Sequence, residues 1–136
     1  MTESPLVLRA AEIDQVDRGA GIRTSSLVGP WNATANEVTS GITTFAPDAG
    51  APLHTHNVEE LVLILAGEAR AVVGDGEFDL AAGDAVWVPA GVPHRFANRG
   101  AGELRFHWVY AGREVTRTIC ATGETVAHLS AADRLA

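Results

Sequence analysis

Two histidines, His54 and His56, stand one residue apart near the middle of the chain. Successive side chains of a β-strand point to opposite faces, so a strand through this stretch brings both imidazoles to one face. Two imidazoles on one rigid element supply half of a metal site. Glu60, at the same parity, and His94, after a Gly-Val-Pro turn, enlarge the set to three imidazoles and one carboxylate. Such a set is typical of a divalent transition-metal site with positions open for other ligands.

The carboxylate of this set has a competitor in the preceding residue, Glu59. Strand parity favours Glu60 as the ligand, and we expect Glu59 to be a solvated or interface charge. Glu60 also has a second possible role, because a carboxylate that leaves the metal can act as a general base beside a bound substrate. We therefore predict Glu60 to be both a metal ligand and a catalytic residue.

The elements that must carry these residues are short strands. Stretches rich in β-branched and aromatic residues are separated by turns rich in Gly, Pro, Asn and Asp, and Gly74-Asp75-Gly76 is a strong hairpin signal. Many short strands with regularly spaced turns predict an all-β sandwich or barrel, with little helix beyond a short one beginning at 130–133. We expect strands within residues 35–46, 54–56, 61–65, 69–73, 78–80, 86–88, 94–98, 104–110 and 115–119.

The run from Leu61 to Leu65 is apolar at every position. A strand at the surface of a monomer should alternate between apolar and polar residues, whereas a strand covered on both sides reads as a continuous apolar run. We therefore expect the outer face of this strand to be covered, either by the N-terminal segment or by a second subunit.

Aromatic residues predict the lining of a pocket. Phe106, Trp108 and Tyr110 share one face of the longest strand, and a barrel interior favours that face. Phe96 has the parity of His94 and should line the same cavity. For these four residues, packing in the core and contact with a substrate both remain open.

The composition restricts the classes of function. The chain has 136 residues and 46% hydrophobic residues, which predicts one globular domain with its own core. A net charge of −7 and the absence of an arginine cluster argue against nucleic acid or an anionic membrane as a partner. The chain contains no lysine, which excludes Schiff-base chemistry and a P-loop. A single cysteine, no signal peptide and no apolar run of about 18 residues predict a cytoplasmic protein.

The two histidine-containing stretches resemble the two motifs of the cupin superfamily. The first motif is met by His54, His56, Glu60 and Gly67, whose spacing again favours Glu60 over Glu59, and its opening glycine is replaced by Asp48. That position only shapes a turn, so the departure leaves the ligand set intact. The second motif is met in full by Gly83, Pro89, Gly91, His94 and Asn98.

This resemblance implies a double-stranded β-helix, or jelly-roll, barrel. The barrel core would span residues 35–120, with residues 1–34 as an N-terminal segment of the same domain and residues 121–136 as a C-terminal tail. His54, His56, Glu60 and His94 would be the metal ligands, while Asn98 would bond backbone groups near a strand end. The family habit and the apolar strand together predict a homodimer.

The resemblance also implies a function for the metal site. It favours Fe2+ or Mn2+, and Ni2+, Co2+ or Zn2+ suit the same ligands. Because imidazole must be neutral to bind, we expect metal loss at about pH 5 to 6. The implied activity is a metal-dependent enzyme acting on a small organic molecule, above all a dioxygenase-type oxidoreductase. The alternatives are a cupin isomerase, cyclase or decarboxylase, and a non-catalytic module that binds a small acid or sugar.

Overall fold

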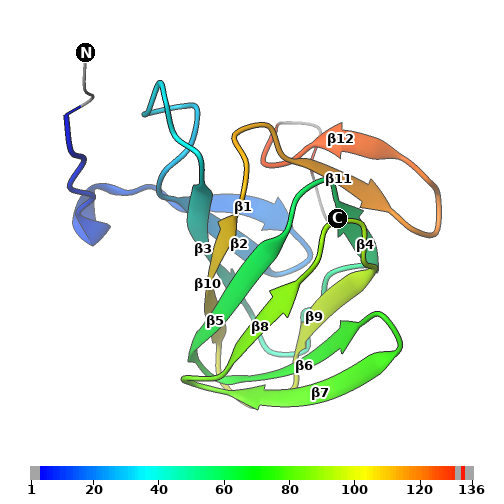
Figure 1. Ribbon diagram of the computed structural model, residues 1–136. Helices are drawn as coiled ribbons and strands as arrows, with labels where there is room; N and C mark the ends of the chain where they lie inside the picture. Colours follow the sequence, from blue (N-terminus) through cyan, green and yellow to red (C-terminus); the bar gives the residue numbers. More distant parts are fainter. Residues whose placement is uncertain (1–3, 131–132, 134–136) are drawn as a thin grey trace.

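A computed structural model describes residues 4–130 and Asp133 (Figure 1). Two six-stranded antiparallel sheets form a jelly-roll barrel, as predicted. The first sheet holds, in spatial order, β1 (Val16–Gly19), β2 (Ile22–Ser26), β3 (Thr39–Phe45), β10 (Leu104–Tyr110), β5 (Glu60–Ala66) and β8 (Ala85–Val88). The second holds β12 (Thr125–Ala127), β11 (Thr116–Ile119), β4 (His54–His56), β9 (His94–Asn98), β6 (Glu68–Val73) and β7 (Gly76–Ala81).

Alternation along β10 shows how the sequence builds the barrel interior. Phe106, Trp108 and Tyr110 are at most 5% exposed, whereas the intervening His107 and Val109 are half-buried and Arg105, before them, is exposed. Trp108 lies opposite Gly41 of β3, where a Cβ atom would stand 2.3 Å from the indole ring. A glycine is required there because the indole occupies the space that a side chain would need.

Turn chemistry fixes the register of the second sheet. Gly74 and Asp75 connect β6 to β7 through the pair Val73–Gly76, which confirms the predicted hairpin. At the end of β9, Asn98 donates hydrogen bonds to the carbonyl oxygens of Phe45, Ala46 and Gly102 at 3.2, 3.2 and 2.8 Å. This amide thus joins the end of one sheet to the other, which is the structural role expected for it.

The two chain ends contribute strands at the edges of the sheets. The segment 1–34 supplies β1 and β2, after a 3-10 turn, η1 (Ala10–Glu12), and the segment 121–136 supplies β12. The predicted start of a C-terminal helix falls largely on residues 131–132, outside the described residues. Among the residues that the structure describes, no helix is long and apolar enough to cross a membrane.

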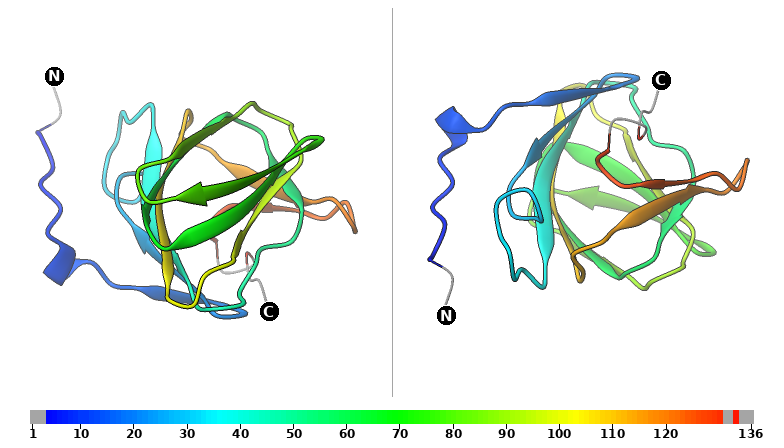
Figure 2. Two further views of the ribbon diagram at one scale, coloured as in Figure 1. Left: turned by 90° about the horizontal axis from the view of Figure 1, so that it is seen from below. Right: turned by 90° about the horizontal axis from the view of Figure 1, so that it is seen from above.

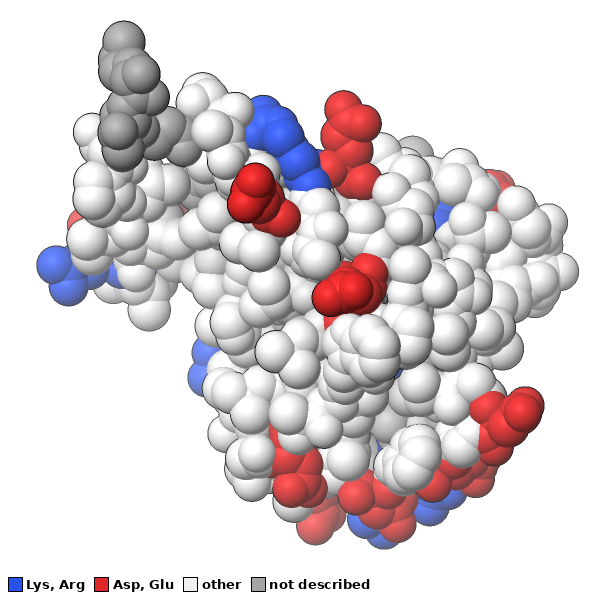
Figure 3. Space-filling view, viewed as in Figure 1, with Lys and Arg blue, Asp and Glu red and all other residues white. Residues whose placement is uncertain are grey.

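The outer face of β5 is open in the single chain. Leu61, Leu63 and Leu65 are 49%, 37% and 40% exposed, and Trp87 beside them on β8 is 60% exposed. Residues 4–15 of the N-terminal segment stand away from the barrel on another side and do not cover them (Figures 1 and 2). Of the two predicted covers, the N-terminal segment is therefore wrong, because the leucines of β5 stay exposed beside it. Much of the middle of this face is uncharged, and charged side chains gather toward its lower edge (Figure 3).

Candidate metal centre

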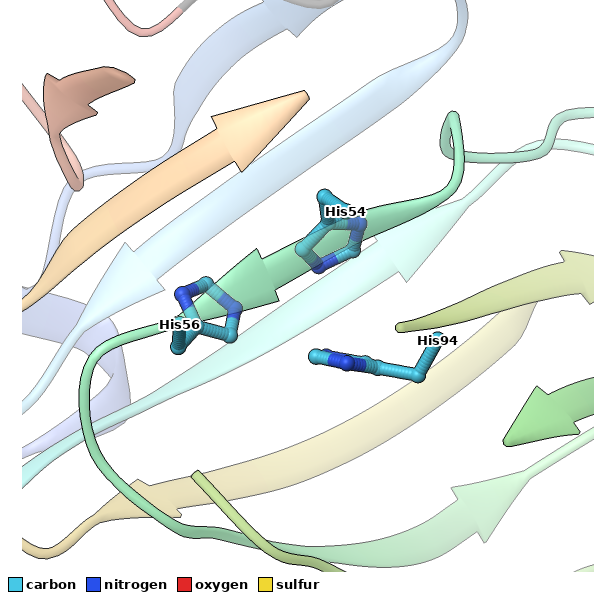
Figure 4. Close-up of side chains that lie close together, drawn as sticks. All are labelled: His54, His56 and His94. Carbon is cyan, nitrogen blue, oxygen red and sulfur yellow. The ribbon is translucent and has the colours of Figure 1, made fainter. Parts of the chain in front are cut away.

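Three histidines meet on the inner face of the second sheet. His54 and His56 belong to β4, and His94 begins the neighbouring β9 directly opposite His54. Their rings turn toward one another (Figure 4), and one ring nitrogen of each lies within 4.8 Å of the others. All three side chains are buried, at 8%, 4% and 1% exposure.

Backbone carbonyl groups orient each imidazole. A carbonyl oxygen only accepts hydrogen bonds, so a ring nitrogen that contacts it carries the hydrogen. In the neutral ring, the other nitrogen then has a free lone pair. The Nδ1 atoms contact the carbonyl oxygens of Pro52 for His54 (2.7 Å), Thr116 for His56 (2.9 Å) and Val92 for His94 (2.9 Å). The Nε2 lone pairs are thereby held toward the centre, in the outer-shell arrangement that metal-binding histidines use.

Burial keeps the imidazoles of His54 and His56 neutral. It lowers the pKa of His54 to about 3, helped by the neighbouring His94. Burial likewise lowers the pKa of His56 to about 2, helped by the charge that a protonated His128 would carry. Neutral rings are the metal-binding form, so at neutral pH these two donors are ready to bind.

A carboxylate reaches the histidines from the opposite sheet. Glu60 is 4% exposed, and its Oε1 lies 3.1 Å from His94 Nε2 and 3.9 Å from His56 Nε2. With the Nδ1 atoms protonated, these nitrogens and this oxygen are all electron-pair donors, which repel unless a proton or cation lies between them. The donor set therefore fits a divalent metal ion. Glu59, by contrast, is exposed.

The route by which Glu60 arrives corrects the parity argument. β4 ends at His56 and β5 begins at Glu60, and the two strands belong to different sheets. Residues 57–59 carry the chain across between the sheets, so Glu60 is not a later position on the histidine strand. Glu60 nevertheless lies beside the histidines, because β4 and β5 both face the interior of the barrel.

A pocket lies beside the histidines and takes in all four predicted lining residues. Phe96, Phe106, Trp108 and Tyr110 line it together with His54 and Glu60. The remaining lining residues are Arg18, Thr24, Thr43, Phe45, Ala51, Arg117, His128, Leu129 and Asp133. Five of the eight Phe, Trp and Tyr residues of the chain thus line the pocket next to the candidate metal centre.

None of these nine further lining residues is predicted from the sequence, and four of them carry titratable or charged side chains. Arg18 and Arg117 both form ion pairs with Asp133, the first at 3.3 Å, and His128 Nδ1 lies 2.7 Å from Asp133 Oδ2. Asp133 is only 1% exposed. Sequence spacing cannot predict this cluster, because Arg18 and Asp133 are 115 positions apart. The sequence also predicts residues 121–136 to be a C-terminal tail outside the barrel core.

Tyr110 connects this charged group to the histidines. Its hydroxyl lies 2.9 Å from His128 Nε2 and 3.3 Å from His56 Nε2. His128 donates its Nδ1 hydrogen to Asp133, so in the neutral ring Nε2 accepts the hydrogen of the Tyr110 hydroxyl. Burial, and next the negative charge of Glu60, raise the pKa of Tyr110 well above its ordinary value, so the phenol stays protonated.

Comparison with known proteins agrees with this architecture. The family model for the cupin domain matches residues 41–110, more than half of the chain. No match was found among curated protein sequences. An RmlC-like cupin from Shewanella frigidimarina is 20% identical, with a TM-score of 0.69 over 82% of this chain and 94% of its own.

Two further solved structures share the fold. KdgF from Halomonas sp. is 16% identical, with a TM-score of 0.71 over 81% of this chain and 96% of its own. Oxalate decarboxylase from Lactobacillus farciminis is 19% identical, with a TM-score of 0.76 over 88% of this chain but 37% of its own. The family match and the jelly-roll barrel together show that the chain belongs to the cupin family.

Proposed function

We propose that the protein is a metal-dependent enzyme that carries out dioxygenase-type oxidation of a small organic molecule bound in the aromatic pocket. One observation carries this proposal. Three Nε2 lone pairs, each fixed by a carbonyl bond behind it, converge with the Glu60 carboxylate at one end of that pocket.

One divalent ion per chain would be held by His54, His56, His94 and Glu60. Fe2+ or Mn2+ is the favoured ion, and the same ligands accept Ni2+, Co2+ or Zn2+. When bound, such an ion supplies Lewis-acid chemistry and, if it is redox-active, the activation of dioxygen.

The residues of the chain would supply positioning and proton control. The rings of Phe96, Phe106 and Trp108 surround the bound molecule and keep water out of the pocket. Glu60 lies where it can accept a proton from a molecule bound beside it. The Tyr110 hydroxyl, hydrogen-bonded to His128, lies beside His56 and would hold the hydrogen bonds on that side of the metal centre in place.

Dioxygen consumption is the direct test. The protein is loaded with Fe(II) without air, mixed with members of a panel of phenols, diketones and thiols, and then given dioxygen. We expect dioxygen uptake in step with loss of one of these compounds. Conversion without dioxygen would instead identify an isomerase, cyclase or decarboxylase. Tight binding of an unaltered compound without uptake would identify a binding module and overturn the enzymatic proposal.

A cytoplasmic location belongs to the same proposal. Cys120 is the single cysteine, and it is exposed as a free thiol, which suits a reducing compartment.

A further inference from the structure

One wall of the aromatic pocket is charged. Arg18 of β1, Arg117 of β11 and Asp133 near the C-terminus all line it, and they are 7%, 4% and 1% exposed. Both guanidinium groups pair with the single Asp133 carboxylate, which also accepts the backbone N–H of Leu129 at 2.8 Å. Two buried cations therefore share one buried anion at the edge of the site.

The charges that line the pocket balance only without a metal. Among the described lining residues, Arg18 and Arg117 are positive, Glu60 and Asp133 are negative, and the imidazoles are counted as neutral. Their sum is zero, so the divalent ion of the proposed function, on which this inference rests, gives the pocket a net charge of +2. A proton on any imidazole would add to it. Uncompensated charge in an enclosed, apolar site is costly, so the loaded pocket favours an anionic ligand.

The arginine pair indicates which anion would fit. A guanidinium group has a planar set of donors that matches a carboxylate, and these two arginines already bind the carboxylate of Asp133. The lining also includes the aromatic residues Phe45, Phe96 and Phe106, and the ring centroid of Phe106 lies 5.5 Å from that of Phe45 and 5.3 Å from that of Phe96. A carboxylate bound beside the charged wall would therefore have aromatic rings around its apolar part.

We propose that the pocket binds a small carboxylate with an apolar body, and that Arg18 and Arg117 set this preference through their positive charge. The excess charge attracts the carboxylate, and the aromatic rings bind the remainder of the molecule. Uncharged molecules of the same shape gain only the second contribution.

Calorimetric titration of the metal-loaded protein tests the preference. The probes are crotonate and benzoate, each matched with its uncharged amide, crotonamide and benzamide. We expect the carboxylates to bind at least about tenfold more tightly than the amides, since a hydrogen bond to a charged group is worth that factor or more. Elemental analysis of the same samples records the metal content.

Variants at the charged wall separate charge from folding. Arg18→Met and Arg117→Met should each weaken carboxylate binding about tenfold or more and leave amide binding unchanged. Arg117→Lys keeps the charge and should retain most of the affinity, whereas Asp133→Asn removes a negative charge and should strengthen carboxylate binding. Arg70→Met, at an exposed arginine on β6, is the matched control and should change neither.

The outcomes distinguish this inference from the proposed function. Full metal content with equal affinity for acids and amides would overturn the carboxylate preference and leave the metal enzyme standing. Absence of bound metal would overturn the proposed function, and the charge argument with it. If Arg117→Met does not fold, Asp133→Asn decides, because weaker carboxylate binding in that folded variant would contradict the charge argument.

Discussion

Replacing Asp133 by asparagine removes a buried carboxylate that contacts Arg18, Arg117 and His128. Burial by itself would raise the pKa of Asp133. The hydrogen bond from His128, the charge that this ring carries when it is protonated, the Leu129 N–H and the charge of Arg117 outweigh burial and lower the pKa from 3.8 to about 2. The ionised form is thus stabilised by the fold, and asparagine loses that stabilisation.

The sign and size of the effect follow from this shift. A depressed carboxyl pKa stabilises the folded state above the unfolded-state value, and the contribution is lost as the pH falls through the folded-state value. The shift corresponds to about 2 kcal/mol of unfolding free energy at pH 7 and about 1 kcal/mol at pH 3. The variant also removes one negative charge beside two buried guanidinium groups, so about 2 kcal/mol is the minimum loss expected at pH 7.

Urea unfolding followed by tryptophan fluorescence measures this loss. Trp108 is a suitable reporter because its ring lies 6.1 Å from that of His128. The stability gap between the wild type and Asp133→Asn should shrink by about 1 kcal/mol between pH 7 and pH 3. Asp79→Asn removes the same charge from an exposed ion pair and should cost less than about 1 kcal/mol at either pH. A gap for Asp133→Asn that stays constant from pH 7 to pH 3 would refute the reasoning.

Three further predictions concern the metal centre and the assembly. His94→Ala should abolish stoichiometric metal binding while circular dichroism still reports a folded barrel, and full occupancy by elemental analysis would sink the ligand assignment. Because burial lowers the pKa values of His54 and His56 to about 3 and 2, protons compete weakly for these rings. We therefore expect metal to be retained below about pH 5 to 6, in place of the loss in that range that the sequence alone predicts. Release in that range during a dialysis series would contradict the burial argument. A second copy of the chain should cover the exposed leucines of β5, so sedimentation should show a dimer at micromolar concentration and a monomer for Leu63→Arg. A monomeric wild type would rule out that dimer.

Local spacing determined much of the candidate site from the sequence alone. Residues two apart on a strand share a face whatever the rest of the fold does, so His54 and His56 had to point the same way. The same rule aligned Phe106, Trp108 and Tyr110, and all three lie buried along the pocket. The hairpin between β6 and β7 was equally predictable, since the turn residues Gly74 and Asp75 specify it without help from distant residues.

The tertiary structure decided everything that depends on which strands become neighbours. Glu60 reaches the histidines because the chain crosses from one sheet to the other after His56, which parity along one strand cannot describe. The charged wall joins Arg18, Arg117 and Asp133 from both ends of the chain, and no local pattern pairs residues so far apart. These three side chains and Glu60, whose charges together sum to zero, meet only inside the folded barrel. For that physical reason the proposed preference for an anionic ligand follows from the fold and not from the sequence.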